Sequence, residues 1–161
     1  MKKLSMAELH RATLEEFSSQ KKIPLVVVLD DIRSMNNVGS VFRTCDGLAA
    51  ERIILCGITA CPPNKEISKT ALGATESVAW TYEKDVVTAV KQLQTDGYKV
   101  YMVEQTDDSI MLQDFKVIEN QKIAIVMGNE VFGVSDRLLD VVDGAIEIPQ
   151  FGTKHSFNVT I

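Results

Sequence analysis

Short apolar runs recur along the chain and alternate with stretches of mixed polarity. After Pro24 the run Leu25–Leu29 is continuous, rich in β-branched residues and followed directly by aspartate, which is typical of a strand buried on both faces. Comparable runs predict further strands at residues 52–55, 77–80, 98–103, 122–127 and 145–148.

The stretches between these runs favour helices. The clearest covers residues 85–96, where Val86, Val90 and Leu93 recur at helical spacing and Gly97 follows. Strands that alternate with helices predict an α/β fold, with a mostly parallel sheet and helices on both faces. Ligands of such sheets bind beyond the carboxyl ends of the strands, so the loops after strands are the candidates for a functional site.

Residues 1–22 precede the first predicted strand and differ from the rest in pattern. Ser5 has the side chain of an N-cap, and Glu8 three residues later completes a capping box. Apolar residues stand among the charged ones at Leu4, Leu9, Leu14 and Phe17. We therefore expect an N-terminal amphipathic helical extension at residues 1–22, followed by one domain at residues 23–161.

The composition limits the class of protein. The chain has 161 residues, of which 45% are hydrophobic and 24% charged, which indicates one globular domain and excludes a disordered or coiled-coil protein. No apolar run approaches the ~20 residues that cross a bilayer, and the polar N-terminus lacks the apolar stretch of a signal peptide. We therefore expect a soluble, cytoplasmic protein with no membrane partner.

The net charge of −5, from 22 acidic and 17 basic side chains, lowers the expectation of a nucleic-acid partner, because phosphate binding usually accompanies a basic excess. The acidity is uneven, however, since residues 1–22 carry five basic and three acidic side chains. A local basic surface is compatible with this average.

The chain has three cysteines, Cys45, Cys56 and Cys61, and two histidines. They are too few and too scattered for a structural zinc site, and an odd number of cysteines is a poor disulfide framework. We expect inert thiols and no metal site.

The loop after the first predicted strand, residues 30–44, contains Gly39 as its one glycine. A dinucleotide-binding fold, or the common class of methyltransferases, would have a glycine-rich turn here, so both are disfavoured. Asn36 or Asn37 is placed to cap a helix that carries Arg43, and Asn37 and Arg43 then border one pocket at its start.

Arg43 also has a simpler interpretation, which its spacing favours. A salt bridge to Asp46 or Glu51 on the surface would account for its position without any function.

The loop after residues 122–127 has Gly128 and Gly133 five residues apart. The lysine of a P-loop is missing after the second glycine, which argues against a phosphate cradle. What remains is a tight turn that presents the Glu130 carboxylate at the end of a buried strand, with residue 135 or 136 capping the next helix. Glu130 is equally compatible with an acidic residue in the first turn of a helix.

In the final segment, residues 148–161, Pro149 and Gly152 end the last predicted strand. Ser156 and Asn158 then stand two residues apart, as polar groups on one side of an extended turn. His155 beside Ser156 suggests a hydrolase only weakly, because adjacent loop residues rarely meet side chain to side chain and no G-x-S-x-G elbow is present.

These polar segments have the patterns N-x-G-x-x-x-R-T from Asn37, G-N-E-x-x-G from Gly128 and I-P-x-x-G-x-x-x-S-F-N-V-T from Ile148. In this order, each after a predicted strand, they resemble the three motifs of the SpoU/TrmH family of RNA 2′-O-ribose methyltransferases, in the SPOUT superfamily. The resemblance covers residues 24–161.

Two features depart from the family pattern. Phe157 stands where the family commonly has leucine, which alters pocket packing but removes no polar group. Family members also continue beyond the position of Ile161 into an apolar C-terminal helix, which passes through a deep trefoil knot and helps to form the dimer. The resemblance therefore implies a SPOUT-type fold with a C-terminal trefoil knot, in a domain at residues 23–161 without this helix. Because the sequence stops at Ile161, two alternatives are open: the knot is incomplete here, or the chain is a piece of a longer protein.

The resemblance implies S-adenosylmethionine as cofactor, held by bent backbone rather than by a glycine-rich turn. It assigns the cofactor pocket to Gly128, Ile148 and Phe157, with Glu104 and Gln105 as further candidates.

The remaining motif residues are assigned to the reacting ribose: Asn37, Arg43, Glu130, Ser156 and Asn158. Arg43 is the family's proposed activator. Because an arginine side chain is an unlikely free base, we expect Arg43 to polarise the 2′-hydroxyl or grip the adjacent phosphate, oriented by Asn37 and Glu130.

The implied function is methyl transfer to a ribose 2′-hydroxyl of tRNA or rRNA by a homodimer, with RNA contacts at Arg33, Arg43, Lys154 and the basic N-terminal segment. One alternative is a non-catalytic RNA-binding or assembly module that keeps the fold. A flavodoxin-like nucleotide binder is a second alternative.

Overall fold

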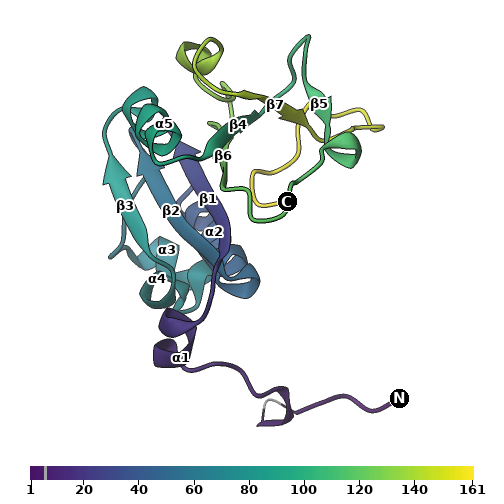
Figure 1. Ribbon diagram of the computed structural model, residues 1–161. Coiled ribbons are helices and arrows are strands. Elements are labelled where there is room, and N and C mark those ends of the chain that lie inside the picture. The colour runs from purple at the N-terminus through teal and green to yellow at the C-terminus, as the bar shows by residue number, and fades with distance from the viewer. Residues whose placement is uncertain (6) are drawn as a thin grey trace.

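The computed structural model describes residues 1–5 and 7–161, and within them the strands form one all-parallel sheet (Figure 1). The strand order is β3-β2-β1-β6-β4-β7-β5. The strands are β1 Ile23–Asp30, β2 Ala50–Cys56, β3 Trp80–Glu83, β4 Lys99–Val103, β5 Ile110–Met111, β6 Ile123–Met127 and β7 Gly144–Glu147. The predicted parallel α/β fold is confirmed.

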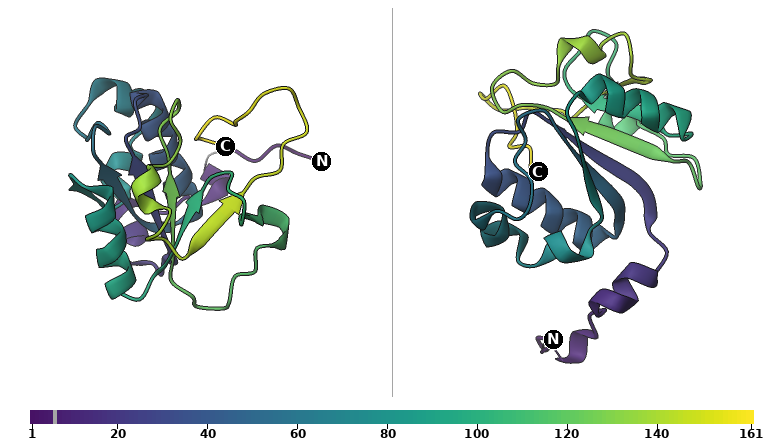
Figure 2. Two further views of the ribbon diagram at one scale, coloured as in Figure 1. Left: turned by 90° about the horizontal axis from the view of Figure 1, so that it is seen from above. Right: turned by 90° about the vertical axis from the view of Figure 1, so that its left-hand side faces the viewer.

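Helices lie on both faces of the sheet, as predicted (Figures 1 and 2). The α-helices are α1 Leu14–Ser19, α2 Met35–Leu48, α3 Lys65–Ala71, α4 Ala74–Ser77 and α5 Val86–Thr95. Shorter 3₁₀ helices cover Ala7–Leu9, Leu112–Asp114 and Asp136–Leu138. The helices α2, α3 and α4 pack on one face and α5 packs on the other.

The central strand β1 shows why its apolar run is continuous. Val26 and Val28 pack into the core on the α5 side, whereas Val27 and Leu29 pack into the core on the α2 side. Successive side chains of a strand point to opposite faces, so each of these four residues is buried. Burial of each such side chain stabilises the fold by about 1.5–3 kcal/mol.

One predicted strand was wrong in position. Ser77 ends helix α4, and strand β3 begins only at Trp80, which pairs with Ile53 of β2. The apolar character of residues 77–80 has another cause, because Val78 is buried in the core on the α2 side before the strand begins.

The N-terminal extension forms two short elements instead of one amphipathic helix. Ser5 and Glu8 do interact, since the Glu8 carboxylate accepts hydrogen bonds from Ser5 N–H and Oγ–H, but they frame only the 3₁₀ helix Ala7–Leu9. Helix α1 has its own capping box from Thr13 and Glu16. Of the four apolar residues predicted to form one face, only Phe17 is buried. Residue 6 of the predicted helix lies outside the described residues.

The C-terminal segment 148–161 leaves β7 as an irregular loop, drawn in yellow in Figure 2. It returns far enough for Val159 to pack against the core on the α2 side. The trefoil knot stays a prediction. No helix in the described residues is long and apolar enough to cross a membrane.

Candidate active site

A cavity of about 920 Å³ opens where β4, β6 and β7 end. Its walls are the loop after β4, the loop after β6 and the C-terminal segment 148–161. The cavity lies beyond the carboxyl ends of parallel strands, which is where α/β sheets bind ligands. Its volume is within the usual range for small-molecule sites.

The structure brings most of the predicted site residues together. Those that line the cavity are Asn37, Glu104, Gln105, Gly128, Glu130, Ile148, Ser156, Phe157 and Asn158. The predicted RNA contacts Arg33, Arg43 and Lys154 are exposed and lie outside its lining. The segments of all three motifs therefore meet at one cavity, although they are far apart in sequence.

Acidic side chains predominate among the charged residues of the lining. Five carboxylates line the cavity: Glu104, Asp107, Glu130, Asp136 and Glu147. No lysine or arginine of the described residues does so. Such a surface favours a cationic ligand and opposes a phosphate group.

The predicted tight turn after β6 forms as a narrow bridge between Asn129 and Gly133, which exchange two backbone hydrogen bonds of 2.9 Å. The buried Asn129 side chain holds this turn from inside. Its Oδ1 accepts from the N–H groups of Val131 and Phe132, and its Nδ2 donates to the Asp31 carbonyl at 2.7 Å.

Two positions in this loop require glycine. A Cβ at Gly128 would lie 2.2 Å from the backbone of Gly133 and Val134. Gly133 has a φ of +73°, and its Cβ would lie 2.2 Å from Oε2 of Glu104. The glycines of this segment therefore allow close backbone approach instead of cradling phosphate.

Glu130 joins the loop to the start of helix α2. Its Oε2 accepts from Arg33 N–H at 2.9 Å, and its Oε1 accepts from Ser34 N–H and Asn37 Nδ2, both at 3.0 Å. Partial burial raises the pKa of the Glu130 carboxyl, but these hydrogen bonds outweigh it, so the pKa lies below its ordinary value. Glu130 is therefore an ionised anchor.

The predicted N-cap of helix α2 was wrong. Ser34 occupies the cap, and its Oγ accepts from Asn37 N–H at 3.3 Å. Because the helix starts two or three residues earlier than predicted, the Asn37 side chain is free to donate to Glu130, which is far away in sequence. Serine and asparagine cap equally well, so propensity does not decide between them.

Arg43 is exposed on α2, and it forms no ion pair with any described residue. Both partners that the sequence offered are engaged elsewhere. Asp46 accepts from Ser77 Oγ at 2.5 Å, and Glu51 accepts from the Tyr98 hydroxyl. The interpretation of Arg43 as one half of a surface salt bridge is wrong.

The Glu104 carboxylate lines the cavity and accepts two backbone hydrogen bonds. Its Oε2 accepts from Val134 N–H at 3.1 Å and its Oε1 from Gln105 N–H at 2.9 Å. Each carboxylate oxygen of Glu104 therefore supports a cavity wall while still lining it.

In the C-terminal segment, Asn158 closes a turn by accepting from the N–H and hydroxyl of Thr160, both at 3.1 Å. Ser156 is exposed and makes no hydrogen bond within the described part of the chain. His155 is held by Gln150 through its backbone carbonyl. No Ser156–His155 hydrogen bond is formed among the described residues.

Several lining residues were not predicted as site residues, notably Asp107 and Glu147, and Asp136 was considered only as a helix cap. Glu147 is the last residue of β7, so the rule that sites follow strand ends would have found it. Ser135 does stand at the N-cap of the 3₁₀ helix Asp136–Leu138, as predicted, but its side chain makes no capping bond.

The environment of the three cysteines favours the protonated thiol. Burial raises the pKa of the Cys45 and Cys56 thiols to about 12 and also raises the pKa of Cys61. Cys45 and Cys56 pack within the core.

Comparison with known proteins decides the family. The SpoU rRNA Methylase family matches residues 24–161. The chain belongs to this family. The tRNA (guanosine(18)-2′-O)-methyltransferase of Thermus thermophilus is 28% identical over 155 residues, covering 96% of this chain and 77% of that protein.

Solved SpoU structures share the fold. The TrmH/SpoU tRNA modifying enzyme of A. aeolicus aligns with a TM-score of 0.79 at 22% identity, covering 91% of this chain and 73% of that one. The AdoMet-bound rRNA methyltransferase of Sinorhizobium meliloti aligns with a TM-score of 0.79 at 24% identity, covering 87% of this chain and 52% of that one. This chain thus spans about half the length of the latter protein.

Proposed function

We propose that this protein transfers a methyl group from S-adenosylmethionine to a ribose 2′-hydroxyl of tRNA or rRNA. The observation that carries this proposal is that each of the three motifs contributes residues to one cavity, whose lining holds five carboxylate side chains and no lysine or arginine of the described residues. Family membership and relatives named as RNA methyltransferases support it.

The cavity fits the proposed cofactor. Apolar side chains of Met102, Ile146, Ile148 and Phe157 offer contacts for a planar base, and the carboxylates suit a positively charged sulfur. A flavin or dinucleotide would bring phosphate groups to the same acidic surface, which disfavours the flavodoxin-like alternative. When bound, S-adenosylmethionine supplies an electrophilic methyl group on its sulfonium.

The ribose side of the site is assigned to the edge where α2 begins. Glu130 fixes Asn37 beside the cavity, and Arg43 follows on the same helix with its guanidinium free of carboxylate partners among the described residues. Arginine stays protonated at working pH, so Arg43 polarises the 2′-hydroxyl or binds its neighbouring phosphate. Ser156 and Asn158 border the ribose from the C-terminal segment.

RNA phosphates are bound outside the acidic cavity. Arg33, Arg43 and Lys154 are exposed and lie outside its lining. They supply local positive charge for phosphate binding, although the net charge of the chain is −5. We expect modest RNA affinity that falls as salt rises, because binding cations to phosphates releases counterions.

A homodimer is part of this proposal. Large apolar side chains at the cavity remain exposed, among them Phe132 at 84% and Phe157 at 48%. Exposed apolar patches of this kind mark interaction surfaces. We place the protein in the cytoplasm, where tRNA and ribosomes are modified.

Isothermal calorimetry with S-adenosylmethionine tests the cofactor, and ribose-methylation mass spectrometry of total RNA with and without the gene tests the reaction. Binding together with loss of one 2′-O-methyl mark in the deletion strain is expected. Absence of cofactor binding by a full-length protein would instead favour a non-catalytic RNA-binding or assembly module.

A further inference from the structure

The loop Gly128–Ser135 forms one wall of the cavity but contains no helix and only the Asn129–Gly133 bridge. Its shape therefore depends on what accepts its backbone N–H groups. The N–H groups of Val131, Phe132 and Gly133 donate to oxygen atoms of Asn129 within the loop itself.

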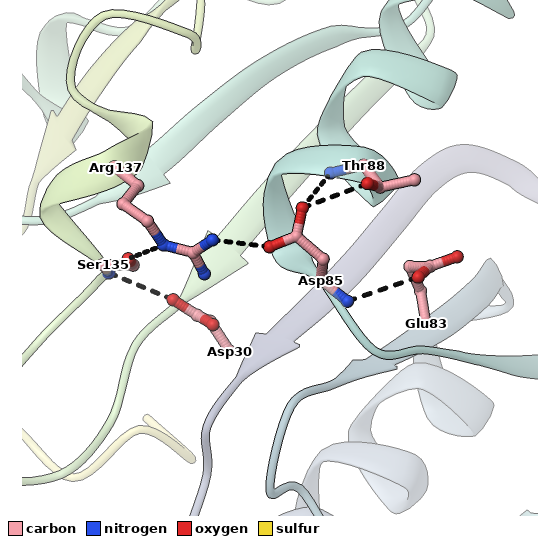
Figure 3. A network of polar contacts seen from close by, with 6 residues as sticks. All are labelled: Asp30, Glu83, Asp85, Thr88, Ser135 and Arg137. Atoms are coloured by element: carbon pink, nitrogen blue, oxygen red, sulfur yellow. Dashed lines mark hydrogen bonds and ion pairs between the residues drawn. The ribbon is translucent and has the colours of Figure 1, made fainter.

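The next two N–H groups have acceptors outside the loop, at the carboxyl ends of two strands. Val134 N–H donates to Glu104, which follows β4, and Ser135 N–H donates to Oδ2 of Asp30 at 3.0 Å (Figure 3). Glu104 lines the cavity, whereas Asp30 does not. The end of the loop is thus fixed by a residue outside the cavity lining, Asp30, which is the last residue of the central strand β1.

Asp30 is only 3% exposed, and no other charged side chain of the described residues is as buried. Burial raises the pKa of Asp30, and nearby Asp31 and Asp85 raise it further, whereas Ser135 N–H and Arg137 act in the opposite direction. A carboxyl group is costly to bury unless it is hydrogen-bonded. Its position at the end of β1 therefore points to a specific contact.

That contact is one of several hydrogen bonds that join the loop to residues 30–37, the segment from the end of β1 to the start of α2. Asp30 accepts from Ser135 at the far end of the loop, and the Asp31 carbonyl accepts from Asn129 at its start. Glu130 accepts from residues 33, 34 and 37, just before and within the first turn of α2. Without the Asp30 bond, the loop would be fastened to this segment at its start only. At the other end, the Val134–Glu104 hydrogen bond alone would then join the loop backbone to another segment, and we expect Ser135 to shift relative to the cavity.

We propose that Asp30 is a positioning residue for methyl transfer, an inference that rests on the function proposed above. By accepting the Ser135 N–H, it fixes the loop that lines the cavity and carries Glu130, and it contacts neither the cofactor nor the RNA. The ion pair of Arg137 with Asp85, at 2.6 Å, holds the residues after the loop against the start of α5 (Figure 3). The position requires an acceptor oxygen and does not require a charge.

The first experiment compares Asp30→Ala with Asp30→Asn, because the amide oxygen of asparagine can accept the same N–H. We expect kcat of Asp30→Ala to fall at least ~10-fold, because a small displacement of the loop that carries Glu130 strongly lowers the rate of methyl transfer. Asp30→Asn is expected to stay within about threefold of wild type. Asn64→Ala is the matched control, because Asn64 accepts two backbone N–H groups at the start of α3, away from the cavity.

The second experiment removes the donor instead. Ser135 has a φ of −55°, which proline adopts, so Ser135→Pro deletes the N–H without opposing this angle. We expect Ser135→Pro to reproduce the kcat loss of Asp30→Ala, and Ser135→Ala to retain wild-type kcat. If the two groups act through one bond, the double variant D30A/S135P loses no more than either single variant. These comparisons keep the inference testable if Asp30→Ala does not fold.

The outcomes separate the two proposals. Wild-type protein that does not methylate RNA overturns the proposed function. Active wild type together with an unchanged kcat in Asp30→Ala, or with an Asp30→Asn variant as poor as Asp30→Ala, overturns the role of Asp30. Amide hydrogen exchange at Ser135 gives a readout independent of activity, and we expect faster exchange in Asp30→Ala but not in Asn64→Ala.

Discussion

The side chain of Asn37 donates a hydrogen bond of 3.0 Å to Glu130, a residue 93 positions later in the chain. This bond connects helix α2, which carries Arg43, to the loop that walls the cavity. Glu130 also accepts hydrogen bonds from the backbone N–H groups of residues 33 and 34. The bond is therefore the point at which the proposed ribose site and the proposed cofactor site are held in one geometry.

Replacement of Glu130 tests this connection through pH. Because the pKa of Glu130 is lowered in the folded protein, its stabilising effect is complete above the ordinary glutamate pKa of about 4.3 and is lost as pH falls through the lower folded value. Thermal melting of wild type and Glu130→Gln should differ most near neutral pH and converge in acid. A difference that grows as pH falls would contradict this account.

Arg43→Ala should abolish methyl transfer but leave cofactor binding measurable. Arg43 is exposed and unpaired among the described residues, so the free energy of unfolding should change by no more than about 0.5 kcal/mol. Lys91→Ala, an exposed cation on α5, is the control and should behave as wild type. Retained turnover in Arg43→Ala would overturn the assignment.

Ser156→Ala and Asn158→Ala should each lower methyl transfer by roughly 10- to 100-fold, with melting temperatures close to wild type. Both residues are exposed in an irregular segment that borders the cavity. Thr153→Ala, in the same segment but outside the lining, is the control. Equal activity of all three variants would remove this segment from the ribose site.

The two glycines of α2 should respond oppositely to alanine. A Cβ at Gly39 would lie 2.2 Å from the Ile67 carbonyl oxygen of α3, whereas a Cβ at Gly47 meets nothing within 4 Å. Gly39→Ala should destabilise the fold by about 1–3 kcal/mol, and Gly47→Ala should stabilise it by about 0.5 kcal/mol. Chemical denaturation measures both, and a stabilising Gly39→Ala would refute the close packing of α2 on α3.

The sequence predicted the central part of the fold because its strands are buried on both faces. Leu25–Leu29 is apolar throughout for that reason, and a run of this kind is recognisable without any alignment. The edge strand β5 was not predicted, since it has two residues and both are exposed. A strand was wrongly predicted at residues 77–80 because Val78 is apolar and buried, although β3 begins only at Trp80.

The sequence predicted many of the residues of the candidate site but not the hydrogen bonds between them. The motifs identified Asn37 and Glu130, and Glu104 was a further candidate beside them. Their hydrogen bonds join segments about 30 to 97 residues apart, and such pairings follow only from the folded sheet. Asp30 carried no signal, because an aspartate after an apolar run is a common strand end. Its burial becomes visible only when Ser135 is placed beside it.

Incubation of the protein with methyl-labelled S-adenosylmethionine and RNA from a strain lacking the gene tests the central claim most directly. After digestion to nucleosides, mass spectrometry should find the label on a ribose 2′-oxygen, with wild type but not with Arg43→Ala. Label on a base, or no transfer by a full-length wild-type protein that binds the cofactor, would contradict the account.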